Sequence, residues 1–494
     1  MNRTSALIAH PTSLPGPHGM GDFGASAREW VDTLRAAGVG IWQILPLSPP
    51  GRGWSPYASP SSMGINTLLI SLDSLVHSGL LTRDEMEGSP PVVDHHVNFD
   101  AIQAWKVPRL RQAAERFIRD ADRSALDGYR QFCARQGAWL VNHADFTALK
   151  RRFHNGPWTD WDPPLRDRDP AALQRAREED SLEREIEKAL QWFAHSQWNA
   201  LREYAGHAGI GILGDVGYYV AHDSADVWAH RACFQLDPEG QMQGQGGAPP
   251  DAYAEEGQCW ETPLHRWETH HTERYKWWRR RFRMASLQTR HIRLDHFNGV
   301  TRYWAIPESA STAADGAWAP GPGGNLLQAL TEILPEDTII AEDLGSETPG
   351  GDELRGRWGI PGMRVLQFAI GAPADNPHHP EQIREDICYC ASTHDAPPVE
   401  EWIRSLNASD HKDLEAMAGG SDVWDVLACV WRSKACLATA QIQDVLALGS
   451  AHRMNRPGTE EGNWTWSLPK ELLHGGWTER LKALNEATGR CADA

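Results

Sequence analysis

The chain has 494 residues, of which 41% are hydrophobic and 23% are charged, as in an ordinary globular protein. This length is too great for one simple core and predicts a large domain with insertions or two to three domains. The net charge of −18 argues against nucleic acid and anionic membrane surfaces as partners, so a neutral small molecule or polymer is the expected ligand.

The lack of a recognisable targeting signal and the scattered cysteines predict a cytoplasmic protein. The N-terminal MNRTSALIAHPTSLPG lacks a long apolar segment, and no stretch approaches the roughly 18 apolar residues of a membrane span. The eight Cys are scattered, which indicates free thiols in a reducing compartment. Cys388 and Cys390 form a C-x-C pair without a second pair nearby, so we do not expect a metal there.

Short apolar runs recur along the chain, and several are continuous rather than alternating, as in buried parallel strands. Helical stretches separate many of them, such as AREWVDTLRAAG after the first and NLLQALTEILPE before the fifth. This alternation favours a (β/α)₈ TIM barrel over an open doubly wound sheet, and no GxGxxG or P-loop supports a nucleotide enzyme. In chain order the runs are SALIAHPTSLP, GVGIWQILPLSPP, GIGILGDVGYYVA, HIRLDHFNGV, DTIIAEDLG, GMRVLQFAI and DICYCASTHD.

Two stretches interrupt the alternation. Residues 74–205 are charged and helix-rich, which predicts a helical insertion after the second strand. Residues 1–73 would then carry the first barrel strands and helices, and residues 206–494 the remainder of the barrel. The Gly/Pro-rich segment QGQGGAPPDAYAEEGQCW predicts a substrate-covering lid loop near 245–260.

Three of the apolar runs end in carboxylates, which places Asp295, Glu342 and Asp395 near strand ends. Glycoside chemistry needs one carboxylate as nucleophile and one carboxylic acid to protonate the leaving oxygen. A third acidic group suggests electrostatic or substrate-orienting help. A barrel would gather such strand ends on one rim.

Strand periodicity indicates how these side chains point. Arg293 and Asp295 are two apart and should share the interior face, where a guanidinium favours the ionised carboxylate that a nucleophile requires; a structural ion pair fits equally well. Glu342 continues the face of Ile340, and an acid in its role needs a raised pKa. Asp343 should then point outward as a hydrogen-bonding residue.

Other candidate residues lie at the same rim. His394, beside Asp395, could donate a hydrogen bond to a sugar hydroxyl, and Asp215 in GDVGYY is either a fourth rim acid or structural. No HExxH or G-x-S-x-G motif supports a zinc protease or a serine hydrolase. Among 23 Trp, those beside glycines in loops suit sugar platforms best, namely Trp54, Trp260, Trp464 and Trp466.

With these residues in view, the chain resembles the 4-α-glucanotransferases, also called amylomaltases or disproportionating enzymes, of the α-amylase clan. The resemblance covers almost the whole length, and the order and spacing of its motifs make it specific. They are HPTSLPGPHGMGDFG, WQILPLSP, SPYASPSSMGINTLLI, VAHDSADVWAHRACF, GAPPDAYAEEGQCWETPLHRW, IRLDHFNG, IIAEDLG, GIPGMRVLQF, STHD and RMNRPGTEEGNWTW.

The resemblance implies a (β/α)₈ barrel with helical insertions and no C-terminal β-sandwich, and a retaining double displacement on α-1,4-glucans without a cofactor or metal. It makes Asp295 the nucleophile, Glu342 the general acid/base and Asp395 the transition-state stabiliser. The segment 245–260 would be the lid over the acceptor side. The expected sugar contacts are Arg293, His394, Tyr57, Gln258, Trp260 and Asn463, together with the rim acid Asp215.

The implied donors and acceptors are malto-oligosaccharides, maltodextrin or starch-type glucans, with glucose as a further acceptor. Two alternatives remain open, a glucan hydrolase and a non-catalytic glucan-binding barrel. The chain departs from the family pattern at Ala396–Pro398, where Asn and polar residues are usual, and at Glu255, Glu256 and Glu261 in the lid segment. These departures bear on subsites and on the ratio of transfer to hydrolysis.

Overall fold

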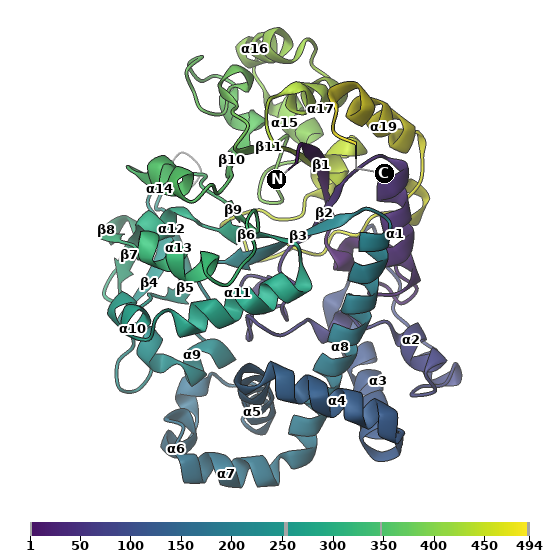
Figure 1. The fold of residues 1–494 in the computed structure, drawn as a ribbon, viewed down its shortest axis with the longest axis vertical. Coiled ribbons are helices and arrows are strands. Elements are labelled where there is room, and N and C mark those ends of the chain that lie inside the picture. Colours follow the sequence, from purple (N-terminus) through teal and green to yellow (C-terminus); the bar gives the residue numbers. More distant parts are fainter. Residues whose placement is uncertain (1, 251–254, 346–347, 492–494) are drawn as a thin grey trace.

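A computed structural model describes residues 2–250, 255–345 and 348–491 (Figure 1). Eight parallel strands pair in the order β10-β11-β12-β1-β2-β3-β6-β9. The Ala341 N–H donates to the Pro361 carbonyl at 2.8 Å, which joins the two outer strands and nearly closes the barrel. The expected (β/α)₈ barrel is confirmed. The strands are β1 (Thr4–Ile8), β2 (Ile41–Gln43), β3 (Gly211–Gly217), β6 (His291–Asp295), β9 (Ile339–Ala341), β10 (Gly362–Val365), β11 (Ile387–Cys390) and β12 (Leu437–Gln441).

The eighth strand, β12, was not among the predicted runs. Its sequence LATAQ is short and rich in small residues, so it lacks the large apolar side chains that mark the other strands. Pairing identifies it instead, because Thr4 lies opposite Leu437 and Ile8 opposite Gln441 along the whole of β1.

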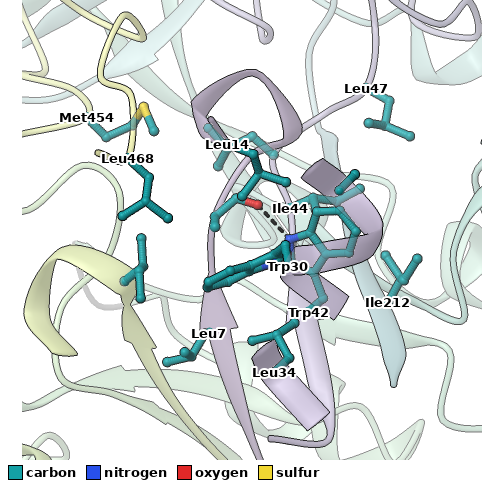
Figure 2. Packing of buried hydrophobic residues seen from close by; sticks show 14 of the residues in the cluster. Leu7, Leu14, Trp30, Leu34, Trp42, Ile44, Leu47, Ile212, Met454 and Leu468 are labelled. Atoms are coloured by element: carbon teal, nitrogen blue, oxygen red, sulfur yellow. Dashed lines mark hydrogen bonds between the residues drawn. The ribbon is translucent and has the colours of Figure 1, made fainter. Parts of the chain in front are cut away.

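The two faces of each strand enter different cores. One face fills the barrel interior with Ala6, Ile41, Leu213, Ile340, Met363, Val365, Cys388, Cys390, Cys436 and Leu437. The other face meets the helices, as where Trp42 packs near Trp30 and Leu34 of α1 (Ala25–Ala36) and donates its indole N–H to the Ala9 carbonyl at 2.7 Å (Figure 2). Cys388 and Cys390 are therefore interior packing residues, and all eight cysteines are free thiols.

Helix α1 follows directly from its sequence. Ala27, Trp30, Val31 and Leu34 are spaced three and four apart, which places them on one buried face. Gly38 follows the helix with a φ of 68°, a left-handed conformation that glycine adopts at low cost and that commonly ends helices.

The segment 74–205 contains helices. They are α2 (Leu72–His77, entering from the barrel side), α3 (Phe99–Asp120), α4 (Arg123–Gln136), α5 (Ala138–Arg152), α6 (Pro163–Arg166), α7 (Pro170–Glu179) and α8 (Ser181–His207). The long helix α8 contacts α3, α4 and α5, and it also contacts α1 and β3 of the barrel (Figure 1). One helix thus joins both parts, and the division of the chain at 73 and 205 stays a prediction.

A four-stranded antiparallel sheet lies beside the barrel and was not predicted. Its order is β5-β4-β7-β8, with β4 (Gly244–Ala248), β5 (Gln258–Pro263), β7 (Arg302–Pro307) and β8 (Ala317–Pro320). The segment 245–260, expected as a lid loop, therefore begins and ends in strands, and its residues 251–254 lie outside the described residues. A Cβ at Gly246 would stand 2.5 Å from the Tyr219 ring, so close packing requires glycine there. Because glycine lacks the apolar side chains by which strands are recognised, this strand was not predicted from the sequence.

Among the remaining helices, α11 packs against β3 and β6, α17 packs against β12, and α19 packs against α1 and α17. No β-sandwich follows the barrel within the described part of the chain. None of the helices built from the described residues is long and apolar enough to cross a membrane. The helices that follow the insertion are α9 (Ala225–Ala229), α10 (Trp267–Thr272), α11 (Lys276–Gln288), α12 (Asn298–Thr301), α13 (Gly324–Thr331), α14 (Gly351–Arg357), α15 (Val399–Ser405), α16 (Ala408–Ala418), α17 (Val423–Arg432), α18 (Ile442–Val445) and α19 (Gly476–Thr488).

Candidate active site

Arg293 links two carboxylates at the end of β6. The β3–β6 register sets Asp215 opposite Arg293 and Gly217 opposite Asp295. The Arg293 Nη1 donates to Asp215 Oδ2 at 2.6 Å, and its Nη2 lies 2.9 Å from Asp295 Oδ1. Leu294 is fully buried among the residues outside the barrel interior, so the predicted alternation along this strand is confirmed.

Glu342 follows β9 and lies beside the same strand end. Its Oε2 accepts the His296 N–H at 2.7 Å, and its Oε1 accepts the Leu344 N–H at 3.1 Å. Burial raises the pKa of the Glu342 carboxyl; the charge of Arg293 opposes this shift, and the charge of Asp295 adds to it. The protonated form of Glu342 is thereby available at pH values where an exposed glutamate is ionised.

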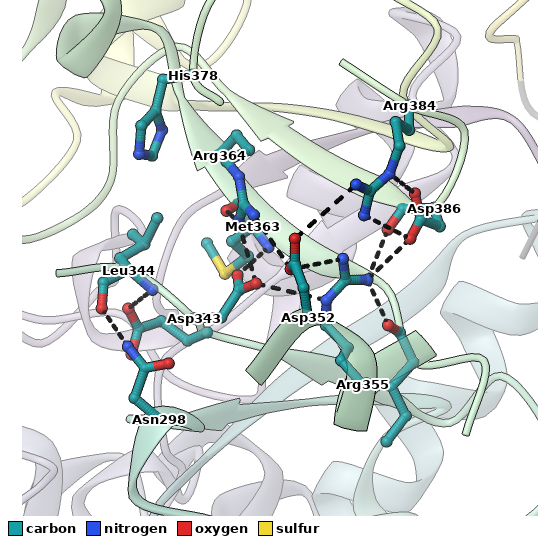
Figure 3. Close-up of polar contacts among 12 residues, drawn as sticks. Asn298, Asp343, Leu344, Asp352, Arg355, Met363, Arg364, His378, Arg384 and Asp386 are labelled. Carbon is teal, nitrogen blue, oxygen red and sulfur yellow. Dashed lines mark hydrogen bonds and ion pairs between the residues drawn. The ribbon is translucent and has the colours of Figure 1, made fainter. Parts of the chain in front are cut away.

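Asp343 points away from Glu342, as its adjacent position in the strand predicts. Its Oδ1 accepts the Met363 N–H at 2.7 Å, and its Oδ2 lies 3.0 Å from Arg364 and 3.4 Å from Arg355 (Figure 3). Asp343 therefore links the end of β9 to β10 and restrains the backbone from which the Glu342 side chain extends.

Tyr57 connects Asp215 with the end of β11. Its hydroxyl donates to Asp215 Oδ2 at 3.0 Å and lies 2.9 Å from His394 Nε2. Because that hydroxyl has one proton, His394 must donate from Nε2, and burial lowers the pKa of this histidine. The same Nε2 lies 3.3 Å from Asp395 Oδ2, so one polar chain runs from Asp395 to Asp295.

Two residues that hold Asp395 were not predicted. The Asn455 Nδ2 donates to Asp395 Oδ1 at 2.6 Å, and Arg453 donates to the Asp395 carbonyl at 3.2 Å. Both come from the segment RMNRPGTEEGNWTW, whose motif was recognised but whose contact with residue 395 arises only from folding. They fix the third carboxylate at the rim.

Trp260 and Gln258 reach the site from β5. The Trp260 ring stands edge-on to the His296 ring at 4.9 Å between centroids, and its N–H donates to Gln258 Oε1 at 3.1 Å. His296 has a φ of 53°, and burial lowers its pKa to about 4, so it is neutral near pH 7. Sequence reasoning missed His296, although its place directly after Asp295 was a signal.

Asn463 shapes its own loop. Its Oδ1 accepts the Arg456 N–H at 2.9 Å, and its Nδ2 donates to the Thr459 carbonyl at 2.8 Å. The next residue, Trp464, lies 5.7 Å from the Tyr57 ring and 6.1 Å from the His394 ring. Asn463 thus supports the aromatic wall of the site.

The other candidate sugar platforms lie differently. Trp466 is 1% exposed and donates its N–H to His452 at 3.0 Å, so the prediction that it serves as a platform is wrong. Trp54 stacks on Phe99 at 4.9 Å. Among the described residues, no group of three or more His, Cys, Asp or Glu side chains could hold a metal ion.

Arg52, Glu261 and Glu460 form an ion-paired group, the Arg52 strap, that joins two loops and strand β5 around the site. The Arg52 Nη1 donates to both oxygens of Glu261, at 2.7 and 2.6 Å, and its Nη2 donates to Glu460 at 2.5 Å. Arg52 precedes Tyr57, Glu261 follows Trp260, and Glu460 lies in the Asn463 loop. The two loops and the strand that carry expected sugar contacts are therefore joined through exposed side chains.

Comparison with known proteins agrees with this geometry. The family model described as 4-alpha-glucanotransferase matches residues 9–472. The 4-alpha-glucanotransferase of Thermus thermophilus is 38% identical over 99% of both chains. A chloroplastic/amyloplastic 4-alpha-glucanotransferase of Arabidopsis thaliana is also 38% identical, over 99% of this chain and 86% of its own length.

A solved structure matches along the whole chain as well. The amylomaltase from Streptococcus agalactiae, solved in complex with acarbose, aligns with a TM-score of 0.95 at 31% identity and covers 99% of this chain and 100% of its own. The barrel, its insertions and its rim residues therefore identify the chain as a member of the 4-alpha-glucanotransferase family.

Proposed function

We propose that this enzyme, a 4-α-glucanotransferase acting on α-1,4-glucans, transfers glucan segments between chains by a retaining double displacement on Asp295 and Glu342. The observation that carries the proposal is the pairing of two unlike carboxyl groups on neighbouring strands. Asp295 is ion-paired with buried Arg293, whereas burial raises the pKa of Glu342. One nucleophile and one acid are what glycoside chemistry requires.

In the first step, Asp295 attacks the anomeric carbon of the donor. Arg293 pairs with Asp295 Oδ1, and Oδ2 has no hydrogen-bond partner among the described residues, so Oδ2 is the attacking oxygen. A bond forms between Oδ2 and the anomeric carbon while the bond from that carbon to the glycosidic oxygen breaks. Glu342 gives its proton to the departing oxygen, and a covalent glucosyl-enzyme remains.

In the second step, Glu342 acts as a base. Its carboxylate takes the proton of the acceptor 4-hydroxyl, whose oxygen attacks the anomeric carbon and releases Asp295. The backbone N–H groups of His296 and Leu344 stabilise the carboxylate between the two steps. Asp395, oriented by Asn455, supplies negative charge beside the oxocarbenium-like transition state.

Transfer requires that a sugar rather than water meets the intermediate. Tyr57, Trp464 and Trp260 offer aromatic faces at the rim, and the Arg52 strap joins the segments that carry them. Aromatic faces that can hold an acceptor sugar favour a transferase over the alternative hydrolase. The converging acids favour an enzyme over a glucan-binding barrel, since binding alone needs no acid with a raised pKa.

We further propose the physiological reactants and location. The neutral, ring-shaped units of malto-oligosaccharides, maltodextrin or starch-type glucans suit a rim of aromatic and polar side chains as donors and acceptors, and glucose suits it as an acceptor. Eight free thiols fit a reducing compartment, which supports the cytoplasm.

The test is a product analysis after incubation with maltotriose alone. Glucose together with a ladder of longer oligosaccharides is the expected result. Glucose and maltose without longer chains would make the enzyme a hydrolase. Glu342→Gln should abolish most turnover, whereas Glu336→Gln, at an exposed position before the same strand, is the matched control and should leave it unchanged.

A further inference from the structure

A cavity lies on the side of the barrel, and we call it the α11 cavity. It occupies about 850 Å³ between insertion helices α4, α5 and α8 and barrel helix α11. Its size falls within the range of about 300–1,000 Å³ typical of small-molecule sites. Its lining includes none of the rim residues assigned to glucan transfer.

The α11 cavity is strongly positive in a chain of net charge −18. Seven Arg and Lys side chains and two Glu side chains line it, a local balance of +5 (seven minus two). Arg279 pairs with Glu332 at 2.7 Å. The other cations have no carboxylate partner within the described parts of the chain, namely Arg135, Arg202, Arg274, Lys276, Arg280 and Arg283.

The start of α11 adds to this positive potential. The helix begins at Lys276 with no acidic residue in its first turn, although acidic residues stabilise helix N-termini. Its sequence KWWRRRFR instead gathers cations at the positive end of the helix dipole. Mutual repulsion of these charges costs stability unless an anion lies among them.

Three polar atoms in the cavity wall have no hydrogen-bond partner among the described residues. They are the Nε2 of His195, which is 6% exposed, the Ser196 hydroxyl and the Arg202 Nε. Such buried atoms usually have partners, because leaving them unsatisfied costs free energy. The His195 ring packs at 5.2 Å from the Phe132 ring and 5.9 Å from the Trp139 ring, so the unpartnered atoms border an aromatic surface.

We propose that the α11 cavity binds a phosphorylated small molecule with a planar ring, of the nucleoside diphosphate class. Phosphate groups would meet the unpaired cations near the start of α11, because guanidinium groups bind phosphate oxygens in pairs. The ring would meet the aromatic wall, where His195 and Ser196 supply polar partners. A neutral glucan needs no such charge, so this ligand differs in class from the substrate of the rim.

The test measures binding of ADP and of inorganic pyrophosphate to the full-length protein by calorimetry at low salt. Saturable binding of one ADP per chain is expected, with pyrophosphate binding more weakly. Lys276→Ala with Arg283→Ala removes two exposed cations and should weaken ADP binding at least about tenfold. The control, Arg432→Ala with Lys482→Ala, makes the same charge change on exposed positions of α17 and α19 and should leave binding unchanged.

Several outcomes would overturn the proposal. They are no saturable ADP binding, equal weakening by the two double variants, or binding of heparin without ADP, which would indicate a macromolecular surface. Pyrophosphate binding as tight as that of ADP would refute the role of the ring. Maltotriose turnover of the α11 variant should match the parent, and its thermal midpoint should not fall below that of the parent, because two mutually repelling charges are removed. Failure of this proposal therefore leaves the glucan-transfer proposal standing.

Discussion

Replacement of Arg355 should test how much the ion pairs around Asp343, next to Glu342, contribute to the stability of the fold. Arg355 is 1% exposed and donates to the Ile360 carbonyl at 2.7 Å while lying 3.1 Å from Asp386, 3.2 Å from Asp352 and 3.4 Å from Asp343 (Figure 3). The variant Arg355→Leu leaves these acceptors without their shared donor. Because one partner of a buried ion network is lost, we expect a cost of about 3–5 kcal/mol.

Arg384 offers a comparison that involves two of the same carboxylates. It lies 2.9 Å from Asp386 and 3.9 Å from Asp352, but its side chain is 56% exposed. Water already solvates its charge, so Arg384→Leu should cost less than about 1 kcal/mol. The two variants differ in burial and not in residue type.

Thermal unfolding followed by circular dichroism provides the assay. An unfolding entropy of about 2.1 cal/mol/K per residue corresponds to about 1 kcal/mol/K for this chain. Arg355→Leu should therefore lower the thermal midpoint by about 3–5 °C, and Arg384→Leu by less than about 1 °C. Equal shifts, or an Arg355 shift within 1 °C of zero, would refute the reasoning. Maltotriose turnover at 25 °C should change little, because backbone N–H groups hold Glu342 independently of Arg355.

The remaining predictions concern the rim and its loops. In Glu342→Gln, maltotriose turnover should fall about 10²–10⁴-fold, and the thermal midpoint should rise at pH 8 and not at pH 4. The pKa of Glu342 in the folded protein is raised, so the free-energy cost of ionising Glu342 begins as pH exceeds its ordinary value of about 4.5. An equal change in midpoint at both pH values would contradict this. Tyr57→Phe removes a hydroxyl with two partners and should lower kcat/KM about tenfold with little change in thermal midpoint; unchanged kinetics would exclude its role. Arg52→Ala should release more glucose without longer products, since the segments that carry the expected sugar contacts lose their shared ion pairs; an unaltered product ladder would show that the strap is dispensable.

Local patterns predicted much of the barrel and its chemistry. Apolar runs marked seven of the eight strands, since buried parallel strands need continuous apolar side chains. Alternation along β6 placed Arg293 beside Asp295, and adjacency separated Glu342 from Asp343. These results depend only on the geometry of one strand, which the local sequence carries.

Contacts between distant segments were not predictable in this way. β12 is recognised by its register with β1, and β4 is a strand in which Gly246 leaves room for the Tyr219 ring. Asn455 holds Asp395 across 60 positions, and Arg52 pairs with Glu261 across 209 positions.

The sequence alone therefore determined the barrel class, the family and the identity of the acids at the rim, because residue type and strand period are local properties. Only the tertiary structure decided the raised pKa of Glu342, the supporting partners of the acids and the positively charged cavity beside α11. The physical reason is that burial, charge pairing and cavity shape depend on which distant segments meet, and no local pattern records those meetings.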